Sequence, residues 1–241
     1  MSSPSERISL VLTILDEAES LPALLEEIDR VFRDFDLLGE VLAVDDGSTD
    51  GSRAILLNLR PRYPRLNLRV LALERNHGKS AALDAGIRAA REPVIVTMDA
   101  DLQDDPADIP ALLRALEGCE AATGVRARRK DGPFKRVSSR IGNRVRNLVL
   151  REKIADSGGP LKAIRKDVLI QLRTFDGFHR FLPTLLRMDG ARVVEVDVRH
   201  RPRRFGRSKY GIRNRMVASL LDLLAVAWMR RRRFDYIVEE K

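Results

Sequence analysis

The amino-acid sequence predicts an α/β fold, with a mostly parallel, doubly wound sheet flanked by helices. Short apolar runs rich in Val, Ile and Leu alternate along the chain with segments whose apolar residues recur every three or four positions. This alternation is typical of βα units, in which a helix connects each strand to the next parallel one. The length of 241 residues fits one such domain with a short appendage.

Strands are expected where the apolar runs are short and end in polar or glycine-rich segments. The first half holds five, over residues 8–15, 40–46, 68–73, 93–100 and 121–125. These five are expected to build the doubly wound sheet. The second half adds two further strands, over residues 159–164 and 192–201.

Helices are expected between these strands. Ser20 precedes an apolar stripe that runs from Leu21 to Phe35 with the spacing of one helix face, and Pro22 is tolerable in its first turn. Other helices are expected over 52–59, 80–91, 106–116, from Phe134, over 166–172 and over 178–188.

The last predicted helix runs from Arg213 to about Met229 and continues into four arginines, residues 230–233. Its apolar face consists of Val217, Leu220, Leu221, Leu224 and Trp228. The pattern is typical of a helix in a membrane interface, and a terminal helix packed on the domain core is the alternative. We expect one domain over residues 1–212 and a C-terminal amphipathic, membrane-interfacial helix over 213–241.

The chain is basic, since 44 Lys and Arg against 35 Asp and Glu give a net charge of +9. Such a surface attracts polyanions, whether nucleic acid, acidic lipid headgroups or phosphorylated substrates. One cysteine, Cys119, excludes an internal disulfide framework and suits a reducing compartment. Neither a signal peptide nor an apolar window of ~18 residues is evident, so we expect neither ordinary secretion nor a transmembrane anchor.

Two acidic clusters follow predicted strands, "VDDGSTDGS" after the second and "MDADLQDD" within and after the fourth. In an open parallel sheet, ligands bind beyond the carboxyl ends of the strands, so the clusters should converge. Asp99 and Asp101 would share one side of a strand that continued through both. Hard oxygen ligands of this kind suit Mg²⁺ or Mn²⁺.

Simpler explanations remain for parts of these clusters. Asp104, Asp105 and Asp108 could cap the helix expected after Pro106, and "VDDGSTDGS" could be only a turn. Because a helix follows this segment and a second acidic cluster stands at another strand end, however, Asp45 and Asp46 are candidates for hydrogen bonds to a nucleoside.

Other kinds of site are disfavoured. The Gly-Lys-Ser of residues 78–80 lacks the P-loop glycine five positions earlier, where Leu73 stands. No G-x-G-x-x-G follows the first strand, and three dispersed histidines with one cysteine form no zinc constellation. A nucleic-acid-binding module would explain the charge but not the acidic clusters, so no nucleic-acid partner is expected.

Six segments in order resemble the GT-A family 2 glycosyltransferases, and within them the branch of dolichol-phosphate mannose synthases and bacterial polyprenyl-phosphate glycosyltransferases. They are "VDDGSTDGS", "NHGKSAALDAG", "MDADLQDDP", "GVRARRKDGPFKRVSSRIGN", "DSGGPLKAIRKDV" and "RHRPRRFGRSKYG". The resemblance runs from about Ile8 to Arg215 and implies a GT-A, Rossmann-like domain over 1–212. It also implies inverting transfer of a sugar from a UDP- or GDP-sugar to a polyprenyl phosphate. A family 2 transferase acting on a polysaccharide or soluble acceptor is the alternative.

The resemblance further implies roles for individual residues. A divalent cation, Mg²⁺ or Mn²⁺, would be held against the donor diphosphate by Asp99, Asp101 and Gln103. The nucleotide sugar would be bound by Glu17, Asp45, Asp46, Lys79, Asp99 and Asp101. The acceptor phosphate would be oriented by Arg126, Arg136, Ser139, Arg140, Arg203 and Lys209. The residues counted as catalytic are Asp99, Asp101, Arg126 and Arg136, and a solvated basic face is the alternative for any single arginine.

Two departures from the family pattern limit these expectations. Where members usually carry a P-x-Y-N-E-like stretch, residues 13–17 read T-I-L-D-E, so Glu17 remains but the choice of UDP or GDP stays open. Several bacterial members continue into two transmembrane helices, and this chain ends at Lys241. We therefore expect a cytoplasmic enzyme, peripheral at the inner face of the membrane, with an integral-membrane protein as a candidate partner.

Overall fold

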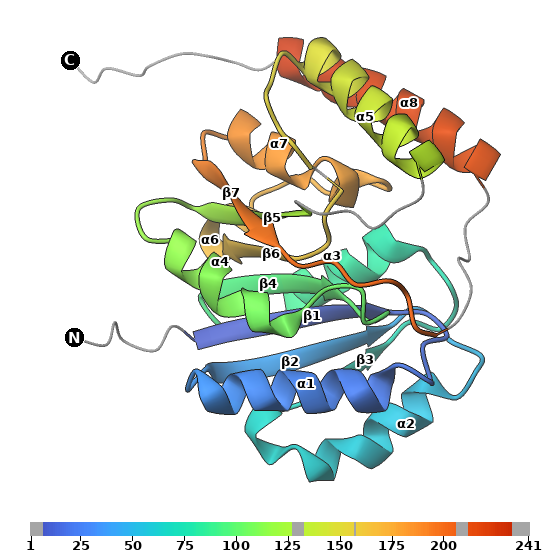
Figure 1. Ribbon diagram of the computed structural model, residues 1–241, viewed down its shortest axis with the longest axis vertical. Coiled ribbons are helices and arrows are strands. Elements are labelled where there is room, and N and C mark those ends of the chain that lie inside the picture. The colour runs from blue at the N-terminus through green and yellow to red at the C-terminus, as the bar shows by residue number, and fades with distance from the viewer. Residues whose placement is uncertain (1–6, 127–132, 157, 206–211, 233–241) are drawn as a thin grey trace.

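A computed structural model describes residues 7–126, 133–156, 158–205 and 212–232, and in the helices that begin at 133 and 212 its side chains are described from 142 and 219 onward. The described residues form one seven-stranded sheet in the order β3-β2-β1-β4-β6-β5-β7 (Figure 1). The strands are β1 Arg7–Ile14, β2 Leu38–Asp45, β3 Arg69–Ala72, β4 Val94–Asp99, β5 Ala121–Arg126, β6 Lys162–Arg165 and β7 Val193–Val198.

The sheet is mostly parallel, as the sequence predicts. β1 pairs in parallel with β2 and β4, β2 with β3, and β5 with β7. The five strands predicted in the first half are not contiguous in the sheet, because β6 lies between β4 and β5 and runs antiparallel to both. β5 does not lie directly beside β4, and one strand position is left between them. β6 occupies this position, and its backbone groups form hydrogen bonds with those of both β4 and β5.

The α-helices lie close to their predicted positions. They are α1 Leu21–Asp34, α2 Ser52–Leu59, α3 Lys79–Ala89, α4 Ile109–Ala115, α5 Pro133–Leu150, α6 Lys166–Leu169, α7 Leu182–Met188 and α8 Ile212–Arg231. Short 3₁₀ turns occur at Arg60–Arg62, Pro64–Leu66, Pro106–Asp108 and Phe178–Arg180. The segments predicted as helices over 106–116 and 178–188 therefore each begin with a 3₁₀ turn.

Two apolar cores cover the two faces of the sheet. In β1, Leu10 and Leu12 belong to the core beneath α1, α2 and α4, whereas Val11 belongs to the core beneath α3, α6 and α7 (Figure 1). This alternation is the period of two that a strand imposes on its side chains. Both faces are apolar, as expected for a parallel sheet covered on both sides.

The stripe of α1 is buried as predicted, except at its end. Its members from Leu21 to Phe32 lie in the core, but Phe35 is 49% exposed. The helix ends at Asp34, so Phe35 no longer follows the helical period.

α8 packs on the domain through a different face from the predicted one. Leu223 and Val226 are buried in the core, and α8 lies beside α5 (Figure 1). Four residues of the predicted apolar face are exposed: Leu220, Leu221, Leu224 and Trp228. The side chain of Val217 lies outside the described part. The helix therefore contacts the core and still presents an apolar surface. Of the helices described, none combines the length and apolarity needed to cross a membrane.

Candidate functional site

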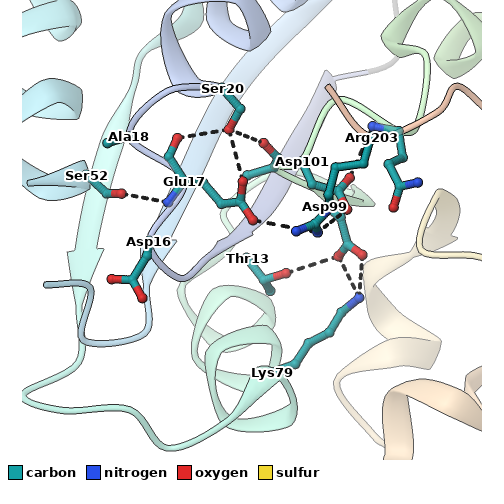
Figure 2. A network of polar contacts seen from close by, with 12 residues as sticks. Thr13, Asp16, Glu17, Ala18, Ser20, Ser52, Lys79, Asp99, Asp101 and Arg203 are labelled. Atoms are coloured by element: carbon teal, nitrogen blue, oxygen red, sulfur yellow. Dashed lines mark hydrogen bonds and ion pairs between the residues drawn. The ribbon is translucent and has the colours of Figure 1, made fainter. Parts of the chain in front are cut away.

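The loops that follow β1 and β2 are tied together at the carboxyl edge of the sheet. The backbone N–H groups of Asp16 and Glu17 donate to the hydroxyls of Ser48 and Ser52, each at 2.9 Å. In return, the N–H of Thr49 donates to the carboxylate of Asp16 at 2.7 Å. These reciprocal bonds hold Glu17 beside the end of β4 (Figure 2).

The two carboxylates of "VDDGS" are buried and organise the neighbouring loops. Asp45 is paired with Arg53 at 2.9 Å. Asp46 accepts the N–H groups of His77 and Gly78 at 2.8 and 2.9 Å, although burial still raises its pKa above the ordinary value. The turn explanation thus accounts for much of this motif, and direct contact of either aspartate with a nucleoside stays a prediction.

Asp99, the last residue of β4, is held by Lys79 at the start of α3. The ammonium lies 2.6 Å from one carboxylate oxygen and 2.7 Å from the other, and Thr13 donates a longer bond of 3.3 Å. Burial tends to raise the pKa of Asp99, but the charge and hydrogen bond of Lys79 outweigh it and the pKa lies below its ordinary value. Asp99 is therefore an anion at neutral pH.

Asp101 faces a second cation, Arg203. The guanidinium lies 2.7 Å from the carboxylate of Asp101 and 3.8 Å from that of Glu17 (Figure 2). Burial lowers the pKa of Arg203, and these anions raise it above the ordinary value. β4 ends at Asp99, so the condition of one strand continuing through both aspartates is not met. Leu102, with φ of 60°, turns the chain here, and Figure 2 shows both carboxylates in one network.

The later aspartates anchor the basic segment 199–203. Asp105 lies 3.2 Å from Arg199 and 2.8 Å from Arg201, and Asp108 lies 2.8 Å from Arg199. Asp105 also accepts the N–H of Ala107 at 3.0 Å, so the capping explanation is confirmed for this residue. The acidic cluster therefore has two parts, one toward the site and one that holds the segment carrying Arg203.

Asp104 lies between these two parts. Its carboxylate oxygens are buried and accept no hydrogen bond from the described residues, and its backbone forms a bridge with His200. Burial, together with the charges of Asp99 and Asp101, raises the pKa of Asp104 to about 7. Near neutral pH this carboxyl therefore adds only part of a negative charge to the cluster.

Arg126 reaches the same edge from the end of β5. Its guanidinium forms two bonds to the carboxylate of Asp156, at 2.7 and 3.1 Å, and both side chains are largely buried. This geometry fixes the guanidinium plane. Four other predicted acceptor residues cannot be placed, since Lys209 and the side chains of Arg136, Ser139 and Arg140 lie outside the described residues.

A cavity opens beside Asp99, lined among others by Lys79, Pro160, Lys162 and His179. Burial and the nearby charge of Lys79 lower the pKa of Lys162 to about 8 and that of His179 to about 3. Sequence reasoning did not single out Lys162, His179 or Asp156. Lys162 and Asp156 lie in the quoted segment "DSGGPLKAIRKDV", and His179 is one of the three dispersed histidines that form no zinc constellation.

Comparison with known proteins decides the family. The profile of Glycosyl transferase family 2 matches residues 9–173, more than half of the chain. The chain belongs to glycosyl transferase family 2.

Two curated members illustrate the likeness. This family 2 glycosyltransferase is 38% identical over 234 residues to dodecaprenyl-phosphate galacturonate synthase of Rhizobium johnstonii, covering 94% of this chain and 68% of the relative. It is 33% identical over 222 residues to undecaprenyl-phosphate 4-deoxy-4-formamido-L-arabinose transferase of Serratia proteamaculans, covering 92% and 68%. The chain thus spans about two thirds of the length of these relatives.

Solved structures show the same GT-A fold. The mannosyltransferase PcManGT of Pyrobaculum calidifontis, in complex with GDP-Man and Mn²⁺, matches with a TM-score of 0.70 and 24% identity, over 94% of this chain and 65% of that one. Glucosyl-3-phosphoglycerate synthase of Mycobacterium tuberculosis, with Mn²⁺, UDP and glucosyl-3-phosphoglycerate, matches with 0.69 and 19%, over 93% and 80%. The predicted fold class is therefore confirmed.

The acidic edge of this glycosyltransferase fits a divalent cation whose coordination is completed by substrate. In the described part of the chain, no group of three or more His, Cys, Asp or Glu side chains is placed to hold a metal. Asp99 and Asp101 are two hard carboxylates, the number typical of Mg²⁺ or Mn²⁺ sites that use phosphate and water as further ligands. Lys79 and Arg203 already stand against them, which indicates that the position attracts positive charge.

Proposed function

We propose that this family 2 glycosyltransferase transfers a sugar, with inversion at the anomeric carbon, from a UDP- or GDP-sugar to a polyprenyl phosphate. The observation that carries the proposal is the meeting of two carboxylates, Asp99 and Asp101, with the basic side chains of Lys79, Arg126 and Arg203 at one edge of the sheet. A nucleotide diphosphate with its cation and an acceptor phosphate need both signs of charge within one site. The two curated relatives described above are named as polyprenyl-phosphate enzymes, which supports the choice of acceptor.

Each charged group then has a task. Asp99, Asp101 and the side-chain oxygen of Gln103 would hold Mg²⁺ or Mn²⁺, which when bound would neutralise charge on the leaving nucleotide. The Mn²⁺ in the two structural neighbours supports a divalent metal without deciding between the two ions. Lys79 keeps Asp99 ionised and oriented.

The acceptor needs orientation more than activation. A phosphate monoester is already an anion, so no side chain has to remove a proton to create the nucleophile. Arg126 is held rigidly by Asp156, and Arg203 now binds carboxylate oxygens, which a guanidinium can exchange for the anionic oxygens of a phosphate. Exchange of a carboxylate for the acceptor phosphate would bring the attacking oxygen to the sugar.

A direct assay tests this function. The protein is incubated with Mn²⁺ or Mg²⁺, polyprenyl phosphate and a panel of UDP- and GDP-sugars, and lipid products are identified by mass spectrometry. We expect a sugar-linked polyprenyl phosphate, nucleotide diphosphate as the second product and an inverted anomeric configuration by NMR. Transfer only to a polysaccharide or soluble acceptor, with the lipid phosphate inert, would replace this function by the alternative.

We further propose a cytoplasmic, peripheral location at the inner face of the membrane. The exposed apolar side chains of α8 are followed by exposed arginines at 230–232, a combination suited to an anionic lipid surface. Each arginine near such a surface contributes about 1 kcal/mol, so the attraction is reversible and sensitive to salt.

Liposome sedimentation tests the membrane contact. The protein should sediment with anionic vesicles at low salt and be released at high salt, and changing Arg230–Arg233 to Ser should weaken sedimentation. Arg60 and Arg62, exposed on the far 3₁₀ turn, provide a control pair for the same substitution. Undiminished binding by the α8 variant would show that another surface of the protein binds the vesicles, and absence of binding by the parent would favour recruitment by an integral-membrane partner.

A further inference from the structure

Another cavity opens at the amino edge of the sheet, opposite the edge that carries the acidic site. Its volume is about 470 Å³, which lies within the range of sites for small molecules. Arg7 begins β1, Arg69 begins β3, and Arg91 and Glu92 stand just before β4 (Figure 1). Because these strands run parallel, their first residues meet at one edge. Of the described residues that line the cavity, none is assigned to sugar transfer.

The charged part of this lining is rich in arginine. It consists of four arginines and two glutamates: Arg7, Arg60, Arg69, Arg91, Glu40 and Glu92. Arg7 forms two bonds to the carboxylate of Glu92, each at 2.8 Å, and Arg69 lies 2.7 Å from that of Glu40. Each glutamate is thus already paired with one arginine. Within the described ranges of the chain, Arg60 and Arg91 form no ion pair, so the lining carries an excess of two positive charges.

The carboxylate of Glu40, which is 5% exposed, fixes one wall of the cavity. It accepts the hydroxyl of Ser9 and the backbone N–H of Arg91, each at 2.8 Å, besides the guanidinium of Arg69. Arg69 also donates to the backbone carbonyl of Ala89 at 3.0 Å. Burial raises the pKa of Glu40, but these donors outweigh it and the pKa lies below its ordinary value. Glu40 is therefore an anion at neutral pH, and it holds the Arg69 side chain and the Arg91 backbone in place.

The wall that carries Arg60 is fixed to this framework. Arg60 begins the 3₁₀ turn Arg60–Arg62, and the ring of Tyr63, the next residue, packs against the apolar core. Further along the same connection, the side chain of Asn67 donates to the backbone carbonyl of Gly39 at 2.8 Å. The connection before β3 is therefore tied to the start of β2, and the cavity has ordered walls on both sides.

The excess charge selects the kind of ligand. Two unpaired guanidiniums in one cavity repel each other, and an anion with two charges that binds both removes this repulsion. A phosphate monoester or a diphosphate carries such a charge at neutral pH, and its oxygens match the donors of a guanidinium. A metal cation is disfavoured, because the two carboxylates of the lining are already paired with arginines.

We propose that this cavity binds the phosphate or diphosphate group of a soluble small molecule, held by Arg60 and Arg91. The cavity lies at the edge of the sheet opposite Asp99 and Asp101, so its ligand is an effector that binds outside the active site and not a substrate of the transfer. The proposal goes beyond the proposed function and does not depend on it.

Calorimetry with inorganic pyrophosphate tests this site. Excess chelator is present, so that no divalent cation can bring the probe to the acidic edge. We expect one site per chain, and the double variant Arg60→Ser, Arg91→Ser should bind about tenfold or more weakly, because it loses two charged hydrogen-bond donors. Both arginines are exposed and unpaired in the described part of the chain, so this variant should unfold at the same temperature as the parent. Absence of binding by the parent at millimolar probe, or equal binding by the double variant, overturns the proposal.

Two single variants establish where the probe binds. Arg62→Ser removes an exposed arginine of the same 3₁₀ turn that does not line the cavity, and it should bind pyrophosphate like the parent. An equal loss in Arg62→Ser would reduce the effect to general surface charge and overturn the site. Arg203→Met alters the opposite edge and should also leave binding unchanged. If Arg203→Met abolished binding, the probe would be located at the catalytic edge and the proposal would be wrong.

The liposome assay separates a soluble ligand from a lipid headgroup. Sedimentation with anionic vesicles should be unchanged when Arg60 and Arg62 are both replaced by Ser, because the cavity is proposed to bind a soluble phosphate. Reduced sedimentation of this pair would assign the cavity to a headgroup and overturn the soluble ligand.

Discussion

Replacing Asp101 by Asn should abolish metal-dependent donor binding and leave the protein folded. The carboxylate is 10% exposed and lies 2.7 Å from Arg203, which is 28% exposed. Loss of one partner costs about 3–5 kcal/mol in a buried ion pair and at most about 1 kcal/mol at the surface. Arg203 is partly exposed and retains Glu17 at 3.8 Å, so we expect about 1–2 kcal/mol of lost stability. The amide oxygen can still accept the N–H of Gln103.

The functional loss should be much larger than this structural cost. The carboxylate supplies a full negative charge to a cation that has few other protein ligands, so transfer should fall by about a hundredfold or more. Thermal unfolding gives an independent readout. A nucleotide diphosphate with Mn²⁺ at one hundred times its Kd stabilises a protein by about 2.7 kcal/mol, and the parent should show this shift while Asp101→Asn should not.

Asp105→Asn is the matched control for this experiment. Asp105 belongs to the same acidic cluster, but its carboxylate binds Arg199, Arg201 and the N–H of Ala107. It should lose stability and keep the metal-dependent thermal shift. Full transfer by Asp101→Asn, or by the parent in excess chelator, would refute the assigned role of Asp101.

Three further predictions concern other parts of the site. Lys79→Met removes the charge that holds the pKa of Asp99 below its ordinary value of about 3.9, while the burial that raises this pKa remains. Asp99 should therefore be protonated at a higher pH in the variant than in the parent, and calorimetry across pH should show metal-dependent nucleotide binding being lost at a correspondingly higher pH. Gly47→Ala should cost more than about 2 kcal/mol in urea unfolding, because φ is 72° and the new Cβ would lie 2.4 Å from the backbone of Arg75. Arg136→Ala should raise the KM for polyprenyl phosphate by a factor equivalent to about 1.5–3 kcal/mol and leave donor affinity unchanged, and the reverse pattern would reassign that arginine.

Much of the fold follows from local sequence signals. The apolar runs and helical stripes locate the elements because their periods report burial directly. The position of β6 does not follow from such signals, since "PLKAI" looks the same in a parallel or antiparallel neighbour. Its place between β4 and β5 depends on pairings between residues 65 to 71 positions apart in β4 and 39 to 43 positions apart in β5.

The site was partly predictable for the same reason. Asp99 and Asp101 could be placed because they follow a strand and the carboxyl ends of parallel strands meet at one edge. Asp105 and Asp108 look identical in sequence, yet they bind Arg199 and Arg201, over ninety residues away. Lys162 lies within an apolar run, so its sequence context gave no sign that its ammonium would face the cavity.

The opposite charges of this protein are arranged so that the site is stable without its substrates. Lys79 with Asp99, Arg203 with Asp101, and Arg126 with Asp156 are pairs in which each partner offsets part of the cost of burying the other. In each pair the carboxylate is suited to binding a cation and the basic side chain to binding a phosphate. A bound cation can therefore take the place of the basic side chain, and a bound phosphate that of the carboxylate, so that neither substrate group enters a site of unpaired charge.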